Sequence, residues 1–154
     1  MNILLTGSEG FIGSNLKSHI EQNIDANIHC IDLKFGDDLQ TCLLPDKIDL
    51  VIHLAGLSGV RQSLDNPTEY WKQNVIVSQR IFETYKDSRI MYASSSTAKE
   101  PWRNPYAFSK FSLEQLAPEK CLGMRFTTTY GPNARENMLI PSIIRNEVDY
   151  INVD

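Results

Sequence analysis

A tyrosine and a lysine four residues apart, Tyr106 and Lys110, have the clearest capacity for proton chemistry in this sequence. At this spacing on a helix the two side chains share one face, so the ammonium can lie near the phenol oxygen. A free phenol is a poor base at neutral pH, but a neighbouring positive charge favours the phenolate and makes it a usable base. Such pairs are common on helix surfaces, so the surrounding sequence decides what this pair means.

Three serines, Ser94, Ser95 and Ser96, precede the tyrosine in a polar loop that follows an apolar run over 89–93. Serine clusters are typical of turns and helix caps. If the run is a strand of a parallel sheet, the loop leaves the carboxyl edge, where doubly wound folds bind their ligands. The serines would then place a hydroxyl beside the base.

A glycine motif at the start of the chain predicts a phosphate site. Gly7, Gly10 and Gly13 follow a short apolar run and open a helical pattern. These glycines allow a tight turn, a close approach of pyrophosphate to the backbone, and close helix–strand packing. Asp32 ends the second apolar run, where a carboxylate can bind adenosine ribose hydroxyls and repel a 2′-phosphate. It favours NAD over NADP, although Lys34 lies close by.

The elements that must position these residues follow an alternating pattern. Short unbroken apolar runs separated by helical patterns predict an α/β fold with a Rossmann-type, doubly wound parallel sheet. We expect residues 1–154 to form a single domain, because no repeat, linker or low-complexity tract is visible. Strands are expected over 2–6, 27–33, 50–54, 89–93 and 122–128, and helices over 13–22, 67–86, 106–116 and 137–146.

Composition excludes several classes of function. The 154 residues carry a net charge of −4 and contain no basic run, which gives no footprint for nucleic acid or an anionic membrane. No stretch reaches the length of a membrane-spanning helix. Cys30, Cys42 and Cys121 fit neither a disulfide framework nor metal-ligand spacing, so we interpret them as reduced residues of a cytoplasmic protein without a metal site.

These motifs, taken together and in order, resemble those of extended short-chain dehydrogenases/reductases of the NAD-dependent epimerase/dehydratase family. This group contains UDP-galactose 4-epimerase and the nucleotide-sugar dehydratases. The matching segments are 7–13, 51–56, 60–63, 66–70, 73–75, 94–96, 105–110, 124–125 and 130–132.

The resemblance implies a set of cofactor contacts. Phe11 and Ile12 join the three glycines around the pyrophosphate, and Asp32 binds the adenosine ribose. Asp38 and Leu39 border adenine. The end of the third strand lines the cofactor with Leu54, Ala55 and Gly56, and Asn74 supports that strand end.

The resemblance also implies catalytic roles. Tyr106 takes a proton from a sugar hydroxyl, and Lys110 binds the nicotinamide ribose and favours the phenolate. Ser96 best matches the family's serine that hydrogen-bonds the reacting oxygen, with Ser95 as the alternative. The helices near 67–86 and 106–116 usually form a homodimer interface in this family.

Three functions remain open on the sequence. The first is transient oxidation of a nucleotide sugar by NAD, followed by epimerisation or elimination. The second is a cofactor-binding module with little turnover, because the chain stops near 150–154, where the family's smaller substrate domain gathers its main elements. The third is an NADPH-dependent keto-sugar reductase, which Asp32 disfavours.

Overall fold

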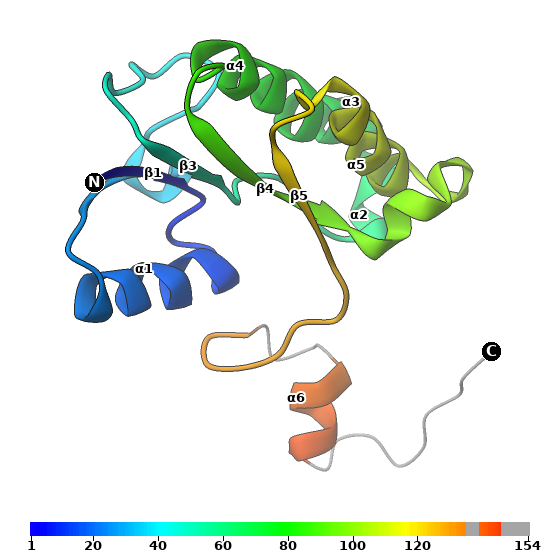
Figure 1. The fold of residues 1–154 in the computed structure, drawn as a ribbon. Helices are drawn as coiled ribbons and strands as arrows, with labels where there is room; N and C mark the ends of the chain where they lie inside the picture. The colour runs from blue at the N-terminus through cyan, green and yellow to red at the C-terminus, as the bar shows by residue number, and fades with distance from the viewer. Residues whose placement is uncertain (135–138, 146–154) are drawn as a thin grey trace.

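The computed structural model describes residues 1–134 and 139–145 and confirms the predicted α/β class (Figure 1). Five parallel strands form one sheet in the order β2-β1-β3-β4-β5. The strands are β1 Asn2–Thr6, β2 Asn27–Ile31, β3 Leu50–His53, β4 Arg89–Ser95 and β5 Leu122–Phe126.

Alternation along the strands produces a core on each face of the sheet. Ile3 and Leu5 of β1 pack with Ile20 on the side of α1, whereas Leu4 between them belongs to the core that contains Ile81 of α4. Helices on both faces therefore remove the apolar strands from water. The helices are α1 Phe11–Asn23, α2 Val60–Asp65, α3 Pro67–Trp71, α4 Val77–Thr84, α5 Pro105–Leu116 and α6 Leu139–Ile144.

The strand order reverses at β1, and this reversal opens the ligand crevice. The chain leaves β1 toward α1 and β2 on one side and leaves β3 toward α2 on the other (Figure 1). In doubly wound sheets the loops at such a point diverge at the carboxyl ends of the strands. The loops after β1, β3 and β4 all emerge at this edge.

The helix expected over 67–86 contains a π-helical turn, η2 Lys72–Ile76, between α3 and α4. An extra residue in one helical turn is often associated with a functional site, and here the turn carries Asn74, which is fully buried. The short helix α2 is not among the elements that the sequence predicts. Of the helix expected over 137–146, residues 137, 138 and 146 lie outside the described residues.

Tight turns and one long loop complete the described structure. The 3₁₀ turns are η1 Leu33–Phe35, η3 Ser96–Lys99 and η4 Pro101–Arg103. Between η1 and β3, residues 36–49 form neither helix nor strand. Within residues 1–134 and 139–145, no helix combines the length and apolar character needed to cross a bilayer.

Candidate active site

Two connected cavities occupy the carboxyl edge of the sheet. The larger one has a volume of about 420 Å³ and the smaller one about 200 Å³. Both are bounded by the turn after β1 and by the loop after β3, so they adjoin one another. Residues that line both are Gly7, Gly10, Leu54, Gly56 and Leu57.

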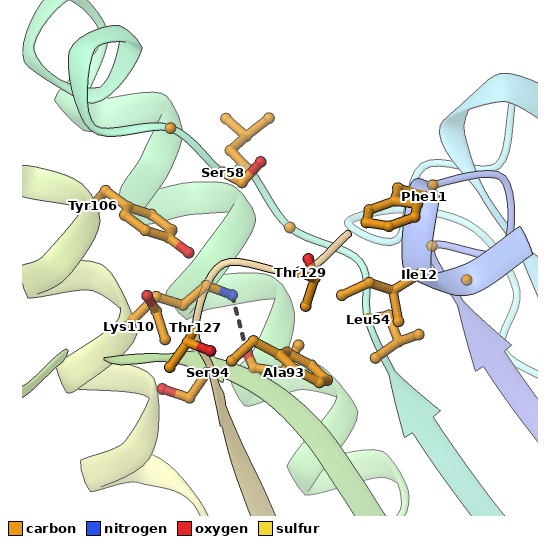
Figure 2. A pocket seen from close by; sticks show the side chains of 18 residues that line it. Phe11, Ile12, Leu54, Ser58, Ala93, Ser94, Tyr106, Lys110, Thr127 and Thr129 are labelled. Carbon is orange, nitrogen blue, oxygen red and sulfur yellow. Dashed lines mark hydrogen bonds between the residues drawn. The ribbon is translucent and has the colours of Figure 1, made fainter. Parts of the chain in front are cut away.

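The glycine turn between β1 and α1 requires residues without side chains. Gly7 has a φ of 71°, and a Cβ there would lie 2.6 Å from the backbone nitrogen of Ala55. A Cβ on Gly13 would lie 2.0 Å from the carbonyl oxygen of Gly7. The turn is therefore packed tightly between β3 and α1, and the N-terminus of α1 opens into the larger cavity. Phe11 and Ile12 extend into that cavity from the first turn of the helix (Figure 2).

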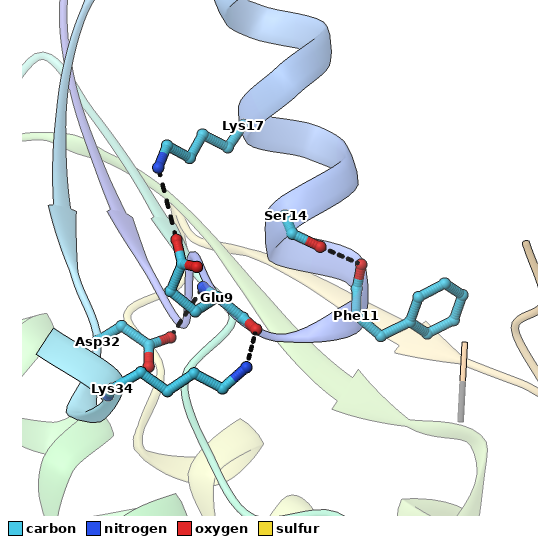
Figure 3. Close-up of polar contacts among 6 residues, drawn as sticks. All are labelled: Glu9, Phe11, Ser14, Lys17, Asp32 and Lys34. Carbon is cyan, nitrogen blue, oxygen red and sulfur yellow. Dashed lines mark hydrogen bonds and ion pairs between the residues drawn. The ribbon is translucent and has the colours of Figure 1, made fainter. Parts of the chain in front are cut away.

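Asp32 ties the end of β2 to the glycine turn (Figure 3). Its Oδ2 accepts a hydrogen bond from the backbone nitrogen of Glu9 at 2.9 Å, and its Oδ1 accepts one from that of Lys34 at 2.9 Å. The Lys34 ammonium donates to the carbonyl oxygen of Glu9 at 2.7 Å. Each carboxylate oxygen has two lone pairs, so Asp32 retains capacity to accept further hydrogen bonds in the smaller cavity that it lines.

The lining of the smaller cavity contains one of the two residues expected at the border of adenine. Leu39 lines this cavity as expected, but its acidic neighbour in the described lining is Asp37 rather than Asp38. The Asp38 carboxylate instead accepts a hydrogen bond from the backbone nitrogen of Gln40 at 2.8 Å and so stabilises the local turn. Gln73 also lines this cavity, and the sequence analysis did not identify it.

The side chain of Asn74 holds the loop after β3 by hydrogen bonds to its backbone. The Asn74 amide accepts a hydrogen bond from the Leu57 nitrogen at 2.7 Å and donates to the Leu57 carbonyl oxygen at 3.0 Å. It also donates to Ser109 of α5 at 2.9 Å. Asn74 is absent from the described lining of either cavity, so its place in the site is to fix the loop. Leu54 and Gly56 line both cavities, and Ala55 lines the smaller one.

His53 lies beneath this loop as a buried, fully paired histidine. Thr6 Oγ1 accepts from the Ala55 nitrogen and lies 2.7 Å from His53 Nδ1. Ser78 donates to the Asn74 carbonyl oxygen and so accepts from His53 Nε2 at 3.0 Å. Nε2 therefore carries a hydrogen. Burial and the charge of Lys110 lower the pKa of His53 to about 3, so the ring is neutral and Nδ1 accepts from Thr6.

Tyr106 and Lys110 both line the larger cavity, on the side opposite Phe11 and Leu54 (Figure 2). Asn104 caps α5 by accepting a hydrogen bond from the Ala107 nitrogen, which fixes the start of the helix that carries the pair. The helix spacing therefore brings the phenol and the ammonium to one wall of the cavity, as expected. The Tyr106 ring also packs edge-to-face against Tyr70, with the centroids 6.1 Å apart.

Lys110 is buried, and a hydrogen bond fixes the position of its ammonium. Lys110 Nζ donates to the carbonyl oxygen of Ala93 at 3.0 Å (Figure 2). Burial lowers the pKa of Lys110 to about 8, and the negative charge of Glu114 opposes that shift. Because this pKa is close to neutral pH, the side chain can bind or release a proton at little cost in free energy.

The serines at the end of β4 divide between two environments. Ser94 and Ser95 line the larger cavity, and Ser96, which begins η3, is not part of the lining within residues 1–134 and 139–145. Ser94 donates to Glu114, and Ser95 Oγ lies 2.9 Å from the hydroxyl of Thr97. Ser95, the alternative on the sequence, is thus the one of those two candidates that faces the cavity.

Several lining residues had no signal in the sequence analysis. They are Ser58 and Gly59 on one side and Phe126, Thr127 and Thr129 after β5 on the other. Figure 2 shows Thr127 and Thr129 in the cavity between the two banks of side chains. Among the described residues, no three histidine, cysteine, aspartate or glutamate side chains gather as metal ligands do.

Comparison with known proteins gives consistent matches. The family model described as the NAD dependent epimerase/dehydratase family matches residues 3–149. A UDP-glucose 4-epimerase from Pisum sativum is 30% identical, with 69% of this chain and 33% of the relative covered. An uncharacterized protein from Methanocaldococcus jannaschii is 30% identical, with 94% of this chain and 61% of the relative covered.

Solved structures agree with this result. MoeE5 in complex with UDP-glucose and NAD is 31% identical, with a TM-score of 0.81, and 94% of this chain and 60% of that one are covered. UDP-glucuronic acid 4-epimerase from Bacillus cereus in complex with NAD is 25% identical, with a TM-score of 0.79 and coverages of 96% and 63%. The chain thus spans less than two thirds of the length of these proteins.

Proposed function

The chain belongs to the NAD-dependent epimerase/dehydratase family, and we propose that it binds NAD in the two connected cavities and takes part in oxidoreduction of a nucleotide sugar. One observation carries the proposal: Tyr106 and Lys110 line the same cavity as the glycine turn of residues 7–13. A proton-transfer pair therefore lies within a site whose other end fits a dinucleotide.

The cavities suit an extended dinucleotide. The pyrophosphate lies at the glycine turn, where the N-terminus of α1 offers backbone N–H groups and a positive dipole end. The absence of Cβ atoms at Gly7 and Gly13 allows the backbone of the turn to pack closely against its neighbours. Asp32 receives the adenosine ribose in the smaller cavity, and the nicotinamide end extends into the larger one beside Lys110.

NAD is preferred over NADP for an electrostatic reason. The Asp32 carboxylate accepts hydrogen bonds from ribose hydroxyls and repels a 2′-phosphate. Lys34 donates one hydrogen bond to the Glu9 carbonyl oxygen and keeps two further N–H groups, so the preference depends on the Asp32 carboxylate. The third function left open by the sequence, an NADPH-dependent reductase, is therefore disfavoured again.

The chain's own residues supply the proton chemistry. Tyr106 accepts the proton of a sugar hydroxyl as phenolate and returns it later, while Lys110 keeps a positive charge near the phenol oxygen. Ser95 or Ser96 donates a hydrogen bond to the reacting oxygen. A dinucleotide held by the glycine turn, Asp32 and Lys110 would supply reversible hydride transfer to and from the sugar carbon.

The substrate class is a nucleoside diphosphate sugar, and turnover by this chain is a proposal of its own. The solved relatives were determined with UDP-glucose or with NAD and related ligands, but this chain spans about three fifths of their length. The second candidate function is a cofactor-binding module that needs another domain or a partner for turnover. Loss of substrate positioning alone can reduce rates by orders of magnitude.

We also propose a homodimer through the faces of α3, η2, α4 and α5. Trp71 and Phe108 stack with their ring centroids 5.9 Å apart, and Trp102 beside them is 77% exposed. Together with Leu64 they line a surface hollow of about 620 Å³. Exposed aromatic groups of this kind are typical of protein interfaces. The three cysteines are free, which fits a cytoplasmic location.

Calorimetric titration of the purified chain with NAD, NADP and UDP-glucose tests the proposal. We expect NAD to bind more tightly than NADP, and UDP-glucose to bind the NAD-loaded chain. Binding of NAD without any sugar nucleotide would support the cofactor-binding module instead. Binding of neither would contradict both candidates. Light scattering on the same samples tests the homodimer, which a monomer at all concentrations would exclude.

A further inference from the structure

The wall of the smaller cavity is built from a loop with no regular structure of its own. Residues 36–49 connect η1 to β3 and form neither helix nor strand. Asp37 and Leu39 of this loop line the cavity together with Asp32 and Gly7. Hydrogen bonds to Asp38 form a local turn within the loop, and contacts with the rest of the fold determine where that turn lies.

Two of those contacts come from side chains of α4 and of the residue that follows it. Arg80 of α4 donates from Nη1 to the Leu39 carbonyl oxygen and from Nη2 to the Cys42 carbonyl oxygen, the latter at 2.8 Å. Farther along, the Tyr85 hydroxyl donates to the Pro45 carbonyl oxygen at 2.8 Å. Of these two side chains, Arg80 contacts the part of the loop nearer the cavity, and Tyr85 contacts the more remote part.

The guanidinium of Arg80 binds backbone carbonyl oxygens and does not form an ion pair among the described residues. Within residues 1–134 and 139–145, no carboxylate lies within ion-pair distance of it. Its rigid planar fork presents separate donors to two carbonyl oxygens and so fixes the distance between them. We call these two hydrogen bonds of Arg80 the clamp. Leu39 connects the clamp to the site, because its carbonyl oxygen accepts from Arg80 and the residue also lines the cavity.

We propose that Arg80 is a positioning residue for the adenosine end of the bound dinucleotide. The inference rests on the proposed function, since it takes the smaller cavity, marked by Asp32, as the adenosine site. With the clamp in place the loop is ordered before the ligand arrives. Without it, binding must also order the loop, and that entropic cost weakens affinity. The nicotinamide end contacts the larger cavity, whose lining excludes the loop.

The experiment compares ligands that contain adenosine with one that lacks it. Calorimetric titration of the full chain and of Arg80→Met uses NAD, ADP-ribose and nicotinamide mononucleotide. We expect NAD and ADP-ribose to bind roughly tenfold more weakly to the variant, since two hydrogen bonds from a charged donor are lost. Nicotinamide mononucleotide should bind equally well. Arg89→Met, at an exposed arginine at the start of β4, is the matched control and should change neither affinity.

Each outcome decides a different claim. Unchanged NAD affinity in Arg80→Met would overturn the inference, and so would an equal loss for nicotinamide mononucleotide, which indicates general damage to the fold. If the unmodified chain does not bind NAD, the proposed function fails before the variant is considered. Amide hydrogen exchange provides a second test without ligand. Residues 36–44 should exchange faster in Arg80→Met than in Tyr85→Phe, and equal exchange in the two variants would contradict the clamp.

Discussion

Glu114 and Arg125 form a two-point ion pair between α5 and β5. Arg125 Nε donates to Glu114 Oε1 at 2.9 Å, and Nη2 donates to Oε2 at 2.7 Å. Glu114 lies one helical turn after Lys110, and it also accepts the hydroxyl of Ser94 at the end of β4. The pair thus joins the outermost strand to the helix of the proton-transfer residues and to the serine loop, and it places a negative charge near the buried lysine.

The first prediction concerns this charge. Because Glu114 raises the pKa of Lys110 against the effect of burial, Glu114→Gln should lower that pKa below its value of about 8. The amide retains an acceptor for Arg125, which limits structural damage. Carbon NMR can monitor the titration of the Lys110 side chain, and the midpoint of that titration should move to lower pH. Glu119→Gln, at an exposed site, is the control. A midpoint that stays in place would show that Glu114 has no electrostatic part in the site.

Replacement of the phenol tests the catalytic assignment. Tyr106→Phe removes the base but leaves the ring that packs against Tyr70, so the fold and NAD affinity should be retained within about twofold. Hydride transfer from a bound sugar nucleotide should fall by at least about 100-fold, the usual contribution of a general base. The absorbance of reduced nicotinamide in single-turnover mixtures measures this rate. Undiminished transfer in the variant would remove Tyr106 from the mechanism.

The choice between the two serines requires its own pair of variants. Ser95→Ala and Ser96→Ala remove one hydroxyl each, and the cavity lining favours a larger loss of single-turnover rate in Ser95→Ala, by roughly tenfold or more. A larger loss in Ser96→Ala would restore the assignment implied by the family resemblance. Equal and small losses would indicate that neither hydroxyl contacts the reacting oxygen.

Cofactor preference depends on the charge of Asp32. Asp32→Asn keeps an oxygen that can accept from one backbone N–H and removes the repulsion of a 2′-phosphate. NAD affinity should fall about tenfold, as expected for loss of a charged hydrogen-bond partner, while NADP affinity changes far less. Titration calorimetry with both dinucleotides measures the ratio, and Asp25→Asn at an exposed position is the control. An equal loss for NAD and NADP would remove the basis for the NAD preference.

The sequence predicted best the features that local geometry dictates. A turn from strand to helix that brings backbone atoms together demands glycine at residues 7 and 13. The carboxylate at the end of β2 lies beside that turn because β2 pairs with β1. The Tyr106–Lys110 spacing likewise determines a shared helix face. Each of these relationships depends on a few consecutive residues or on one strand pairing.

The features that the sequence did not predict depend on distant contacts. Whether Asp37 or Asp38 faces the cavity depends on the turn of a loop that Arg80 holds from another helix. Which serine faces the cavity depends on where β4 ends and η3 begins. The π-helical turn around Asn74 is a further case, because its buried amide bonds to a loop and to α5. Periodicity alone contains none of this information.

The final prediction uses His53 as a reporter of the buried network. Burial, together with the positive charge of Lys110, lowers the pKa of His53 to about 3, whereas an unfolded histidine titrates near 6.5. Between these values the unfolded chain binds the additional proton, so this group reduces stability as pH falls from about 6.5 toward 3. From pH 6.5 to pH 5 the loss is about 2 kcal/mol.

Urea unfolding at both pH values measures this slope, and His53→Asn should flatten it by about that amount although the variant starts less stable. His19→Asn, at an exposed histidine, is the matched control. Nitrogen NMR of the unmodified chain should show His53 as the neutral tautomer with its hydrogen on Nε2 throughout this range, because Thr6 donates to Nδ1 and Ser78 accepts from Nε2. A ring that titrates near pH 6.5 would contradict the network beneath the cofactor loop.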